Sequence, residues 1–200
     1  MRVPSDAEIL ALHEKHSPTP EAFNLVYTHC VVVCRIAEQL HARSGLDADI
    51  ELVRAGCLLH DVGAYRLYDG AGRLDHANYI RHGVLGHELL REEGFPEVIC
   101  RFASHHTGVG LSRDDVLRQE LPLPPCDYLA ETTEESLVMY ADKFHSKTTP
   151  PTLLTADAYA ARVRRFGEDK VAAFESMRAA FGEPGLSSFS SAYGHRVVDH

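Results

Sequence analysis

Residues 50–63 read Ile-Glu-Leu-Val-Arg-Ala-Gly-Cys-Leu-Leu-His-Asp-Val-Gly, so a histidine and an aspartate follow directly on an apolar run. The run predicts a helix over residues 48–60 that is apolar on almost every side. Such a helix is expected at the centre of a fold. Because buried polar groups need partners, His60 and Asp61 are candidate functional residues at the end of this central helix.

Further residues of metal-ligand type lie in four other predicted helices. They are His29 on the apolar stripe of a helix over 20–43, His82 in a helix over 78–93, His105 and His106 at the end of a helix over 96–106, and Asp142 in a helix that ends near 146. A single one of these would be explained by an ordinary hydrogen bond or salt bridge. Together they indicate a metal site, since a buried carboxylate needs a compensating charge. Imidazole and carboxylate ligands suit Mn, Fe, Co, Ni or Zn.

The remaining patterns also predict helices. We expect short helices over 6–16 and 112–118, a proline-rich connection over 121–131, and one amphipathic helix over 156–182. No stretch alternates as a strand would, and the serine-rich tail to His200 is expected to be loosely ordered. The fold class is therefore all-α, a helical bundle around a central metal site. Residues 1–19 form an N-terminal helix and linker, 20–150 the metal-binding domain, and 151–200 a C-terminal helix and tail packed on it.

Composition limits the possible partners and the compartment. The 200 residues carry 29 acidic and 20 basic side chains, a net charge of −9. This balance argues against binding a nucleic acid duplex but is compatible with a small phosphorylated substrate. No apolar run is long enough for a membrane helix, and the polar N-terminus lacks a signal region. We expect a cytoplasmic protein with five free thiols. A homo-oligomer is compatible with the sequence.

The order of these residues resembles a known family. His29, His60-Asp61 and Asp142, with the local run Leu58-Leu59-His60-Asp61-Val62-Gly63, resemble the HD-domain superfamily of metal-dependent phosphohydrolases. Two further elements are similar to those of a binuclear subgroup. They are His82-Gly83-Val84-Leu85-Gly86 and His106-Thr107-Gly108. Together they resemble the diadenosine-tetraphosphate-hydrolase-like branch and its uncharacterised relatives, over about residues 20–150.

The resemblance implies a ligand set and a cofactor. His29, His60, Asp61 and Asp142 would hold a first divalent metal, and Asp61 would bridge to a second one held by His82 and His106. The cofactor is expected to be two transition-metal ions, with Mg also compatible. His105 is an alternative ligand to His106.

The sequence also departs from one branch of the family. Ala64 stands where the HD-GYP branch has lysine, and the Gly-Tyr-Pro element is absent. Hydrolysis of cyclic di-GMP is therefore not expected.

The implied activity is hydrolysis of a small phosphate ester or anhydride, with a nucleotide expected, by attack of metal-activated hydroxide. Asp61 would be catalytic. Lys147, which lies close to Lys143 in the sequence, and Arg66 would contact the phosphate, although these positions are explained equally well as solvated surface cations. Two alternatives stay open. One is a di-iron oxygenase on the same fold, and the other is a non-catalytic nucleotide-binding regulatory module.

Overall fold

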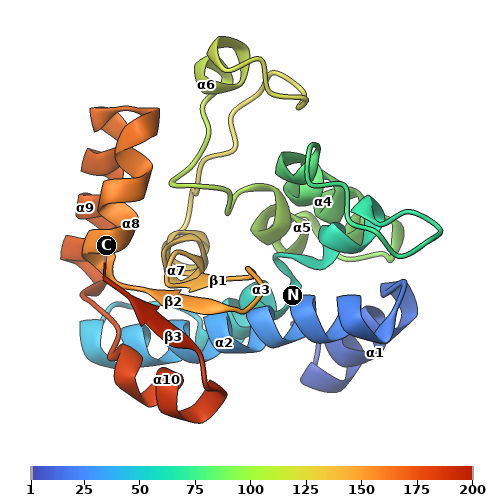
Figure 1. The fold of residues 1–200 in the computed structure, drawn as a ribbon, viewed down its shortest axis with the longest axis horizontal. Helices are drawn as coiled ribbons and strands as arrows, with labels where there is room; N and C mark the ends of the chain where they lie inside the picture. The colour runs from blue at the N-terminus through green and yellow to red at the C-terminus, as the bar shows by residue number, and fades with distance from the viewer. Residues whose placement is uncertain (1, 200) are drawn as a thin grey trace.

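The computed structural model describes residues 2–199, and helices form most of it (Figure 1). The main helices are α1 (Asp6–His16), α2 (Pro20–Ser44), α3 (Ile50–Leu59), α4 (His82–Glu92), α5 (Glu97–Ser104) and α7 (Thr133–Asp142). The prediction of an all-α fold is confirmed. Within residues 2–199, no helix is both long enough and apolar enough to cross a membrane.

The long helix α2 is the base on which the rest is built. The Thr19 hydroxyl accepts the Ala22 amide at its start, Pro20 occupies the first helical position, and Gly45 ends it in a left-handed conformation with φ 66°. These are ordinary start and stop devices for a helix. Helices α3 and α7 pack on α2, and their apolar faces share one core with it. A histidine on the inner face of α2 is therefore at the centre of the molecule.

The segments that follow α3 return to the same centre. The chain passes from α3 into the 3₁₀ helix η1 (Val62–Leu67), and a second 3₁₀ turn, η2 (Tyr79–Arg81), leads directly into α4. Helix α4 packs against both η1 and α5. This packing brings the end of α3, the start of α4 and the end of α5 to one place.

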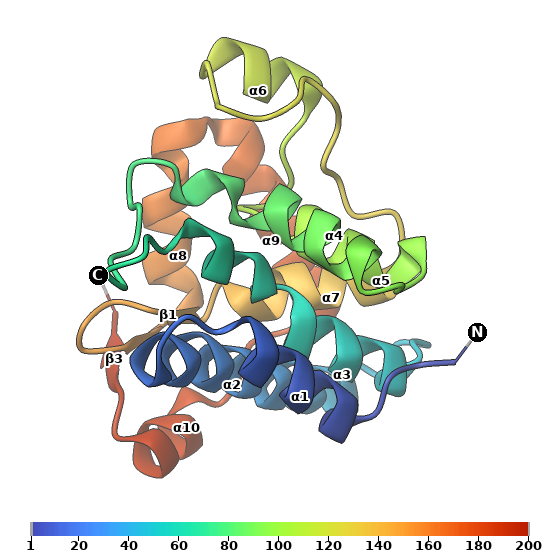
Figure 2. The ribbon, with the colours of Figure 1, turned by 90° about the vertical axis from the view of Figure 1, so that its right-hand side faces the viewer.

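A long excursion separates α5 from α7. It contains the short helix α6 (Arg113–Arg118) and projects away from the other helices (Figure 2). Leu111 and Tyr128 pair as an isolated bridge at its base. Asp115 forms an ion pair with Lys170, which ties the excursion to the C-terminal part of the chain.

The C-terminal part differs from the sequence-based expectation in three ways. It contains a three-stranded sheet of β1 (His145–Ser146), β2 (Thr152–Leu154) and β3 (Arg196–Val198), with β1 antiparallel and β3 parallel to β2. The expected helix over 156–182 is divided into α8 (Ala156–Val163), the turn η3 (Arg164–Phe166) and α9 (Glu168–Phe181). The tail is ordered as α10 (Leu186–Tyr193) followed by β3, while Met1 and His200 lie outside the described residues.

Two of these differences have a local cause. Strands of two or three residues are too short to show the alternating pattern of a sheet. Gly167 has φ 131°, a conformation that favours glycine and interrupts the helix.

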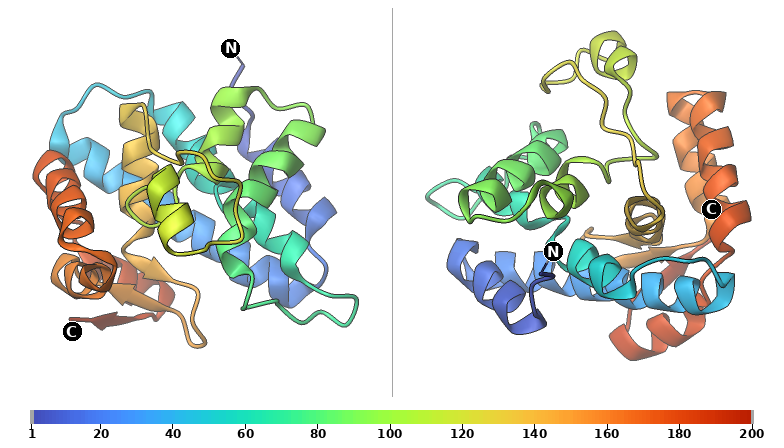
Figure 3. Two further views of the ribbon diagram at one scale, coloured as in Figure 1. Left: turned by 90° about the horizontal axis from the view of Figure 1, so that it is seen from above. Right: turned by 180° about the vertical axis from the view of Figure 1, so that it is seen from behind.

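Helix α9 packs on α7, where the Tyr140 ring lies 5.4 Å from Phe174 and 5.7 Å from Phe181. Helices α8 and α9 lie on the opposite side of the molecule from α1 (Figure 3).

Helix α1 is held against the core by one buried imidazole. Nε2 of His13 donates to the Leu58 carbonyl at 2.7 Å, and Nδ1 accepts from the Tyr65 hydroxyl at 2.8 Å. Burial lowers the pKa of His13 from 6.5 to about 4. Folding therefore requires the neutral ring, whereas the unfolded chain binds a proton below about pH 6.5.

We expect His13 to make the free energy of unfolding decrease as the pH is lowered. Below pH 6.5 the unfolded state binds a proton at this ring, whereas the folded state does not bind it until about pH 4. The free energy of unfolding is therefore lower by roughly 2 kcal/mol at pH 5. Urea unfolding of the wild type and His13→Gln, between pH 8 and pH 5, measures the effect. The variant should be less stable at pH 8, and the gap should narrow toward pH 5. Parallel stability curves would contradict this role of His13.

Candidate metal centre

Five helix segments each supply one or two polar side chains to a single buried cluster. They are His29 from α2, His60 and Asp61 after α3, His82 at the start of α4, His106 after α5, and Asp142 at the end of α7. All are buried except Asp142, whose side chain is 16 % exposed. These are the six residues that the sequence predicts as ligands, and the structure brings all six together.

The two oxygens of Asp61 face two different pairs of histidines. Oδ2 lies 3.3 Å from Nε2 of His29 and 3.6 Å from Nε2 of His60. Oδ1 lies 3.4 Å from Nε2 of His82 and 3.7 Å from Nε2 of His106. A carboxylate in this position can serve two sites at once, one on each side.

Asp142 completes the His29 side of the cluster. Its Oδ1 lies 3.0 Å from Nε2 of His29 and 3.5 Å from Nε2 of His60. Its Oδ2 accepts a hydrogen bond from Lys143 Nζ at 2.7 Å, and the same ammonium donates to the His106 carbonyl at 2.9 Å. Lys143 therefore links the ends of α5 and α7, the two segments that carry His106 and Asp142.

In three of the histidines, a hydrogen bond from Nδ1 to the backbone fixes the direction in which Nε2 points. Nδ1 of His60 donates to the Cys57 carbonyl, Nδ1 of His82 to the Tyr79 carbonyl and Nδ1 of His106 to the Ala103 carbonyl, at 2.6–2.7 Å. In its neutral form, with the proton on Nδ1, each ring presents the lone pair of Nε2 to the cluster. Backbone carbonyls commonly orient metal-binding histidines in this way.

His29 is oriented by another histidine. Its Nδ1 lies 2.8 Å from Nδ1 of His145, and Nε2 of His145 lies 3.0 Å from Nδ1 of His195. The row leads from the cluster to the segment before β3. Burial lowers the pKa of His145 to about 2, so this ring is neutral at any ordinary pH.

The charges in the cluster are nearly balanced. Burial alone would raise the pKa of Asp61, but the adjacent ammonium of Lys147 and the His60 ring lower it well below its usual value. The same opposition, led by Lys143, lowers the pKa of Asp142. Burial lowers the pKa of His29 to about 4 and the pKa of His106 well below 6.5. Burial opposes a charge on His60, but the Asp61 carboxylate raises the pKa of this ring well above 6.5. Two carboxylates thus face two ammonium groups and the His60 ring, with neutral imidazoles at His29 and His106.

The donor atoms fit a divalent metal better than they fit one another. Nε2 of His29 lies 3.1 Å from Nε2 of His60, and Nε2 of His82 lies 3.0 Å from Nε2 of His106. For the second pair both Nδ1 atoms carry the proton, so two lone pairs face each other unless a cation lies between them. Oδ1 of Asp61 is buried without a hydrogen-bond partner among residues 2–199. His29, His60 and Asp142 form one group of potential ligands, and His60, Asp61 and His106 form another.

Two other sequence-based expectations have a different outcome. Arg66 is not brought to the cluster, because its guanidinium pairs with Glu92 and Glu88 on α4. The Nδ1 of His105 lies 2.7 Å from the Ser104 hydroxyl and its ring faces Tyr128, so His105 points away from the other histidines. Lys147, by contrast, forms an ion pair with Oδ2 of Asp61.

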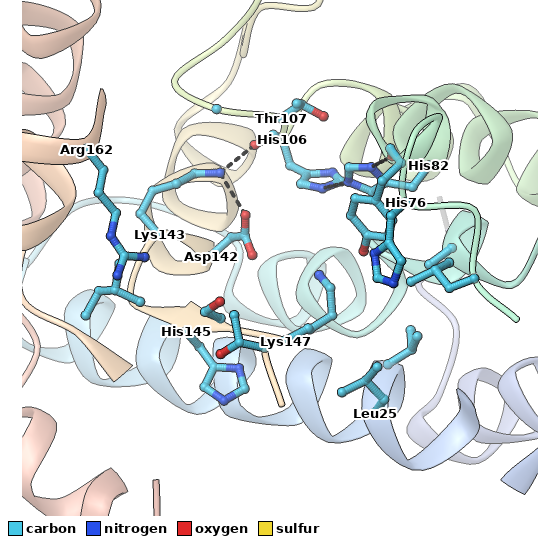
Figure 4. Close-up of a pocket in the computed structure, with 18 of the residues that line it drawn as sticks. Leu25, His76, His82, His106, Thr107, Asp142, Lys143, His145, Lys147 and Arg162 are labelled. Atoms are coloured by element: carbon cyan, nitrogen blue, oxygen red, sulfur yellow. Dashed lines mark hydrogen bonds and ion pairs between the residues drawn. The ribbon is translucent and has the colours of Figure 1, made fainter. Parts of the chain in front are cut away.

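A cavity of about 730 Å³ opens above the cluster (Figure 4). His82, His106 and Asp142 line its floor, together with Lys143 and Lys147. The Tyr79 ring stacks on His82 with centroids 4.7 Å apart, and within the described chain its buried hydroxyl has no hydrogen-bond partner.

The wall formed by α8 and η3 adds residues that sequence-based reasoning missed. They are Tyr159, Arg162, Val163, Arg165 and Phe166. The arginine spacing of three residues places both on one side of a helix, and this spacing was the signal available in the sequence.

The comparisons with known proteins agree with this arrangement. The family model for the HD domain matches residues 26–147, a range that contains all six clustered side chains and Lys147. An uncharacterized protein of Methanocaldococcus jannaschii is 41% identical over 120 residues, which are 58% of this chain and 64% of that protein.

Two methyltransferases are also similar to the chain. The tRNA (cytidine(56)-2'-O)-methyltransferase of Picrophilus torridus is 33% identical over 125 residues, 62% of this chain and 33% of the enzyme. The enzyme of the same name from Thermoplasma volcanium is 31% identical over 140 residues, 70% of this chain and 36% of the enzyme. The chain thus matches about a third of each methyltransferase and just under two thirds of the M. jannaschii protein.

Solved structures with the same fold include the HD domain of the phosphodiesterase PgpH from L. monocytogenes. The TM-score is 0.55 at 17% identity, with 92% of this chain and 98% of that domain covered. The same domain in complex with cyclic-di-AMP gives 0.55 at 18% identity, with 95% and 99% covered.

Proposed function

The chain belongs to the HD domain family, and from this premise we propose that it hydrolyses a phosphate ester or anhydride of a small molecule, with nucleotides as the expected substrates. Family membership and phosphodiesterase neighbours support a metal-dependent phosphohydrolase in general. The finer assignment to small phosphorylated molecules rests on the cavity and its charges.

One observation carries the proposal. Four histidine Nε2 atoms converge on the two oxygens of Asp61, and one of these oxygens has no hydrogen-bond partner among the described residues. Imidazole nitrogens and carboxylate oxygens are the ligands of divalent transition metals. His29, His60, Asp61 and Asp142 would hold one ion, and Asp61, His82 and His106 a second.

Bound divalent metals would supply a water activated near neutral pH and positive charge for the phosphoryl oxygens. The chain's own residues have separate tasks. Lys143 holds Asp142 and the His106 carbonyl in place. The flexible Lys147 side chain, whose ammonium lies over the Tyr79 ring at 5.7 Å, can contact a phosphate in the cavity. The free hydroxyl of Tyr79 is a further donor for the same group.

The charge balance favours an anionic substrate. Lys143 and Lys147 already offset the carboxylates of Asp61 and Asp142, so each divalent ion would add unbalanced positive charge at the cavity floor. In a protein of net charge −9, this makes the cavity a local site of attraction for anions.

Metal analysis followed by an anaerobic assay tests the proposal. Protein purified without chelator should contain up to two transition-metal ions per chain. Metal-stripped protein resupplied with Mg, Mn, Co, Ni or Zn should release phosphate from a panel of nucleotides and sugar phosphates without oxygen, and chelator should stop the reaction. If activity required iron and consumed oxygen, and no phosphate compound were hydrolysed, an oxygenase would replace the proposed hydrolase.

A further inference from the structure

Two arginines that line the cavity have no acidic partner. Within residues 2–199, neither Arg162 nor Arg165 has a carboxylate oxygen within 4.0 Å of its guanidinium. Arg164, which lies between them, pairs with Glu168 at 3.2 Å and does not line the cavity. In a chain with 29 acidic and 20 basic residues, a surface arginine has many potential partners. These two are instead presented to the cavity.

Arg162 and Arg165 lie in α8 and η3, which are held in place by packing and capping contacts. Helix α8 is capped by Thr155, and the Tyr159 ring packs on Phe174 of α9 at 4.7 Å. Arg165 lies over the Phe166 ring at 4.6 Å, a cation–π contact that restrains its guanidinium. Figure 4 shows Arg162 reaching from this wall toward the side of the cavity where Lys143 and Asp142 lie.

The charges that line the cavity are almost all positive. Asp142 is the only acidic side chain among the described residues that line it, and Lys143 neutralises that carboxylate. The metal-binding residues and Lys147 occupy the floor, whereas Arg162 and Arg165 belong to the α8 wall. The apolar side chains Leu154, Val163 and Phe166 also line the cavity. The positive charge is therefore divided between two places in one cavity.

We propose that Arg162 and Arg165 bind a second anionic group of the substrate, separate from the group that is hydrolysed at the floor. The substrate class is then a small organic molecule with two anionic groups and an apolar or aromatic body. This inference rests on the proposed function for the first group. Guanidinium groups bind phosphates and carboxylates through paired hydrogen bonds. A cavity of about 730 Å³ is large enough for a whole nucleotide-sized ligand.

Calorimetric titration of the full chain tests the second subsite. The ligands are adenosine 5′-monophosphate, with one phosphate, and ADP and adenosine 3′,5′-bisphosphate, with two. Each titration is done with protein as purified and again with metal-stripped protein, so that hydrolysis of the ligand cannot distort the titrations of the metal-stripped protein. The wild type should bind at least one doubly phosphorylated ligand about tenfold more tightly than the monophosphate, the size expected for hydrogen bonds to charged groups.

The variants separate this subsite from general charge effects. In R162A/R165A the ratio of the dissociation constant of the monophosphate to that of the doubly phosphorylated ligand should fall toward one. Arg164→Ala removes one arginine charge outside the cavity and should keep the wild-type ratio. Equal binding of all three ligands by the wild type, or an unchanged ratio in the double variant, would overturn the inference. If the ratio behaves as expected but no metal supports phosphate release, the hydrolase proposal fails and the subsite stands.

Discussion

Replacing Asp61 with asparagine is expected to lower turnover at least about a thousandfold and to remove most of the bound metal. Asn keeps the shape of the side chain but loses its negative charge and one of its two oxygen ligands. Asp61 is the one side chain in the cluster whose two oxygens face different histidine pairs, at 3.3–3.6 Å and 3.4–3.7 Å. Asp142 cannot replace it, because the Asp142 carboxylate faces only the His29 side.

The measurements are metal content by mass spectrometry, phosphate release and circular dichroism. The helical signal should survive, since the apolar core formed by α2, α3 and α7 does not depend on this carboxylate. Asp114→Asn makes the same chemical change on the exposed surface of α6 and is the matched control. If Asp61→Asn kept wild-type turnover and metal content, Asp61 would not be a bridging ligand.

The helix ends could be read from the sequence because local chemistry determines them. Thr19 and Pro20 start α2, and Gly45 ends it in the left-handed conformation. Ser112 starts α6 with a reciprocal cap to Asp115. The candidate ligands could be selected for a related reason. A histidine or aspartate on an apolar helix face, such as His29 or Asp142, is costly unless it has a partner.

The orientation of side chains was not available from the sequence. Whether His105 or His106 turns inward depends on which ring reaches the Ala103 carbonyl at the end of α5. Arg66 follows the His60-Asp61 pair closely in the chain, yet η1 directs it to Glu92 on α4. Arg162 and Arg165 follow the last ligand in the sequence, and the packing of α9 on α7 and of α8 on α9 helps to bring α8 and η3 to the cavity.

Two glycines determine how closely the ligand segments approach. Gly63 in η1 and Gly86 in α4 face each other, and a Cβ built on Gly63 would lie 2.1 Å from the His82 carbonyl oxygen and 2.2 Å from the Gly86 amide nitrogen. Both contacts are to backbone, which cannot rotate away as a side chain can. The glycine after His60-Asp61 thus allows α4 to approach η1, and this approach places His82 beside Asp61.

Gly63→Ala is accordingly expected to destabilise the fold and the metal centre together. The overpacking should cost roughly 3 kcal/mol or more, which corresponds to a fall in Tm of about 6–12 °C for a chain of this size. The added methyl group must push the start of α4 away from η1, and His82 moves with it. Metal content should therefore fall even at temperatures where the variant is still folded.

Two other glycine replacements serve as comparisons for the Tm of Gly63→Ala. A Cβ on Gly86 would meet the Ala103 Cβ at 2.9 Å and the Gly63 nitrogen at 3.2 Å, so Gly86→Ala should lower the Tm less than Gly63→Ala. A Cβ on Gly70 would meet no atom within 4 Å, and Gly70→Ala should leave the Tm within about 1 °C of the wild type. Thermal unfolding and metal analysis of the three variants check the order. A Gly63→Ala protein with wild-type Tm and metal content would show that α4 can retreat from η1 without disturbing His82, and the close approach would then have no role in building the site.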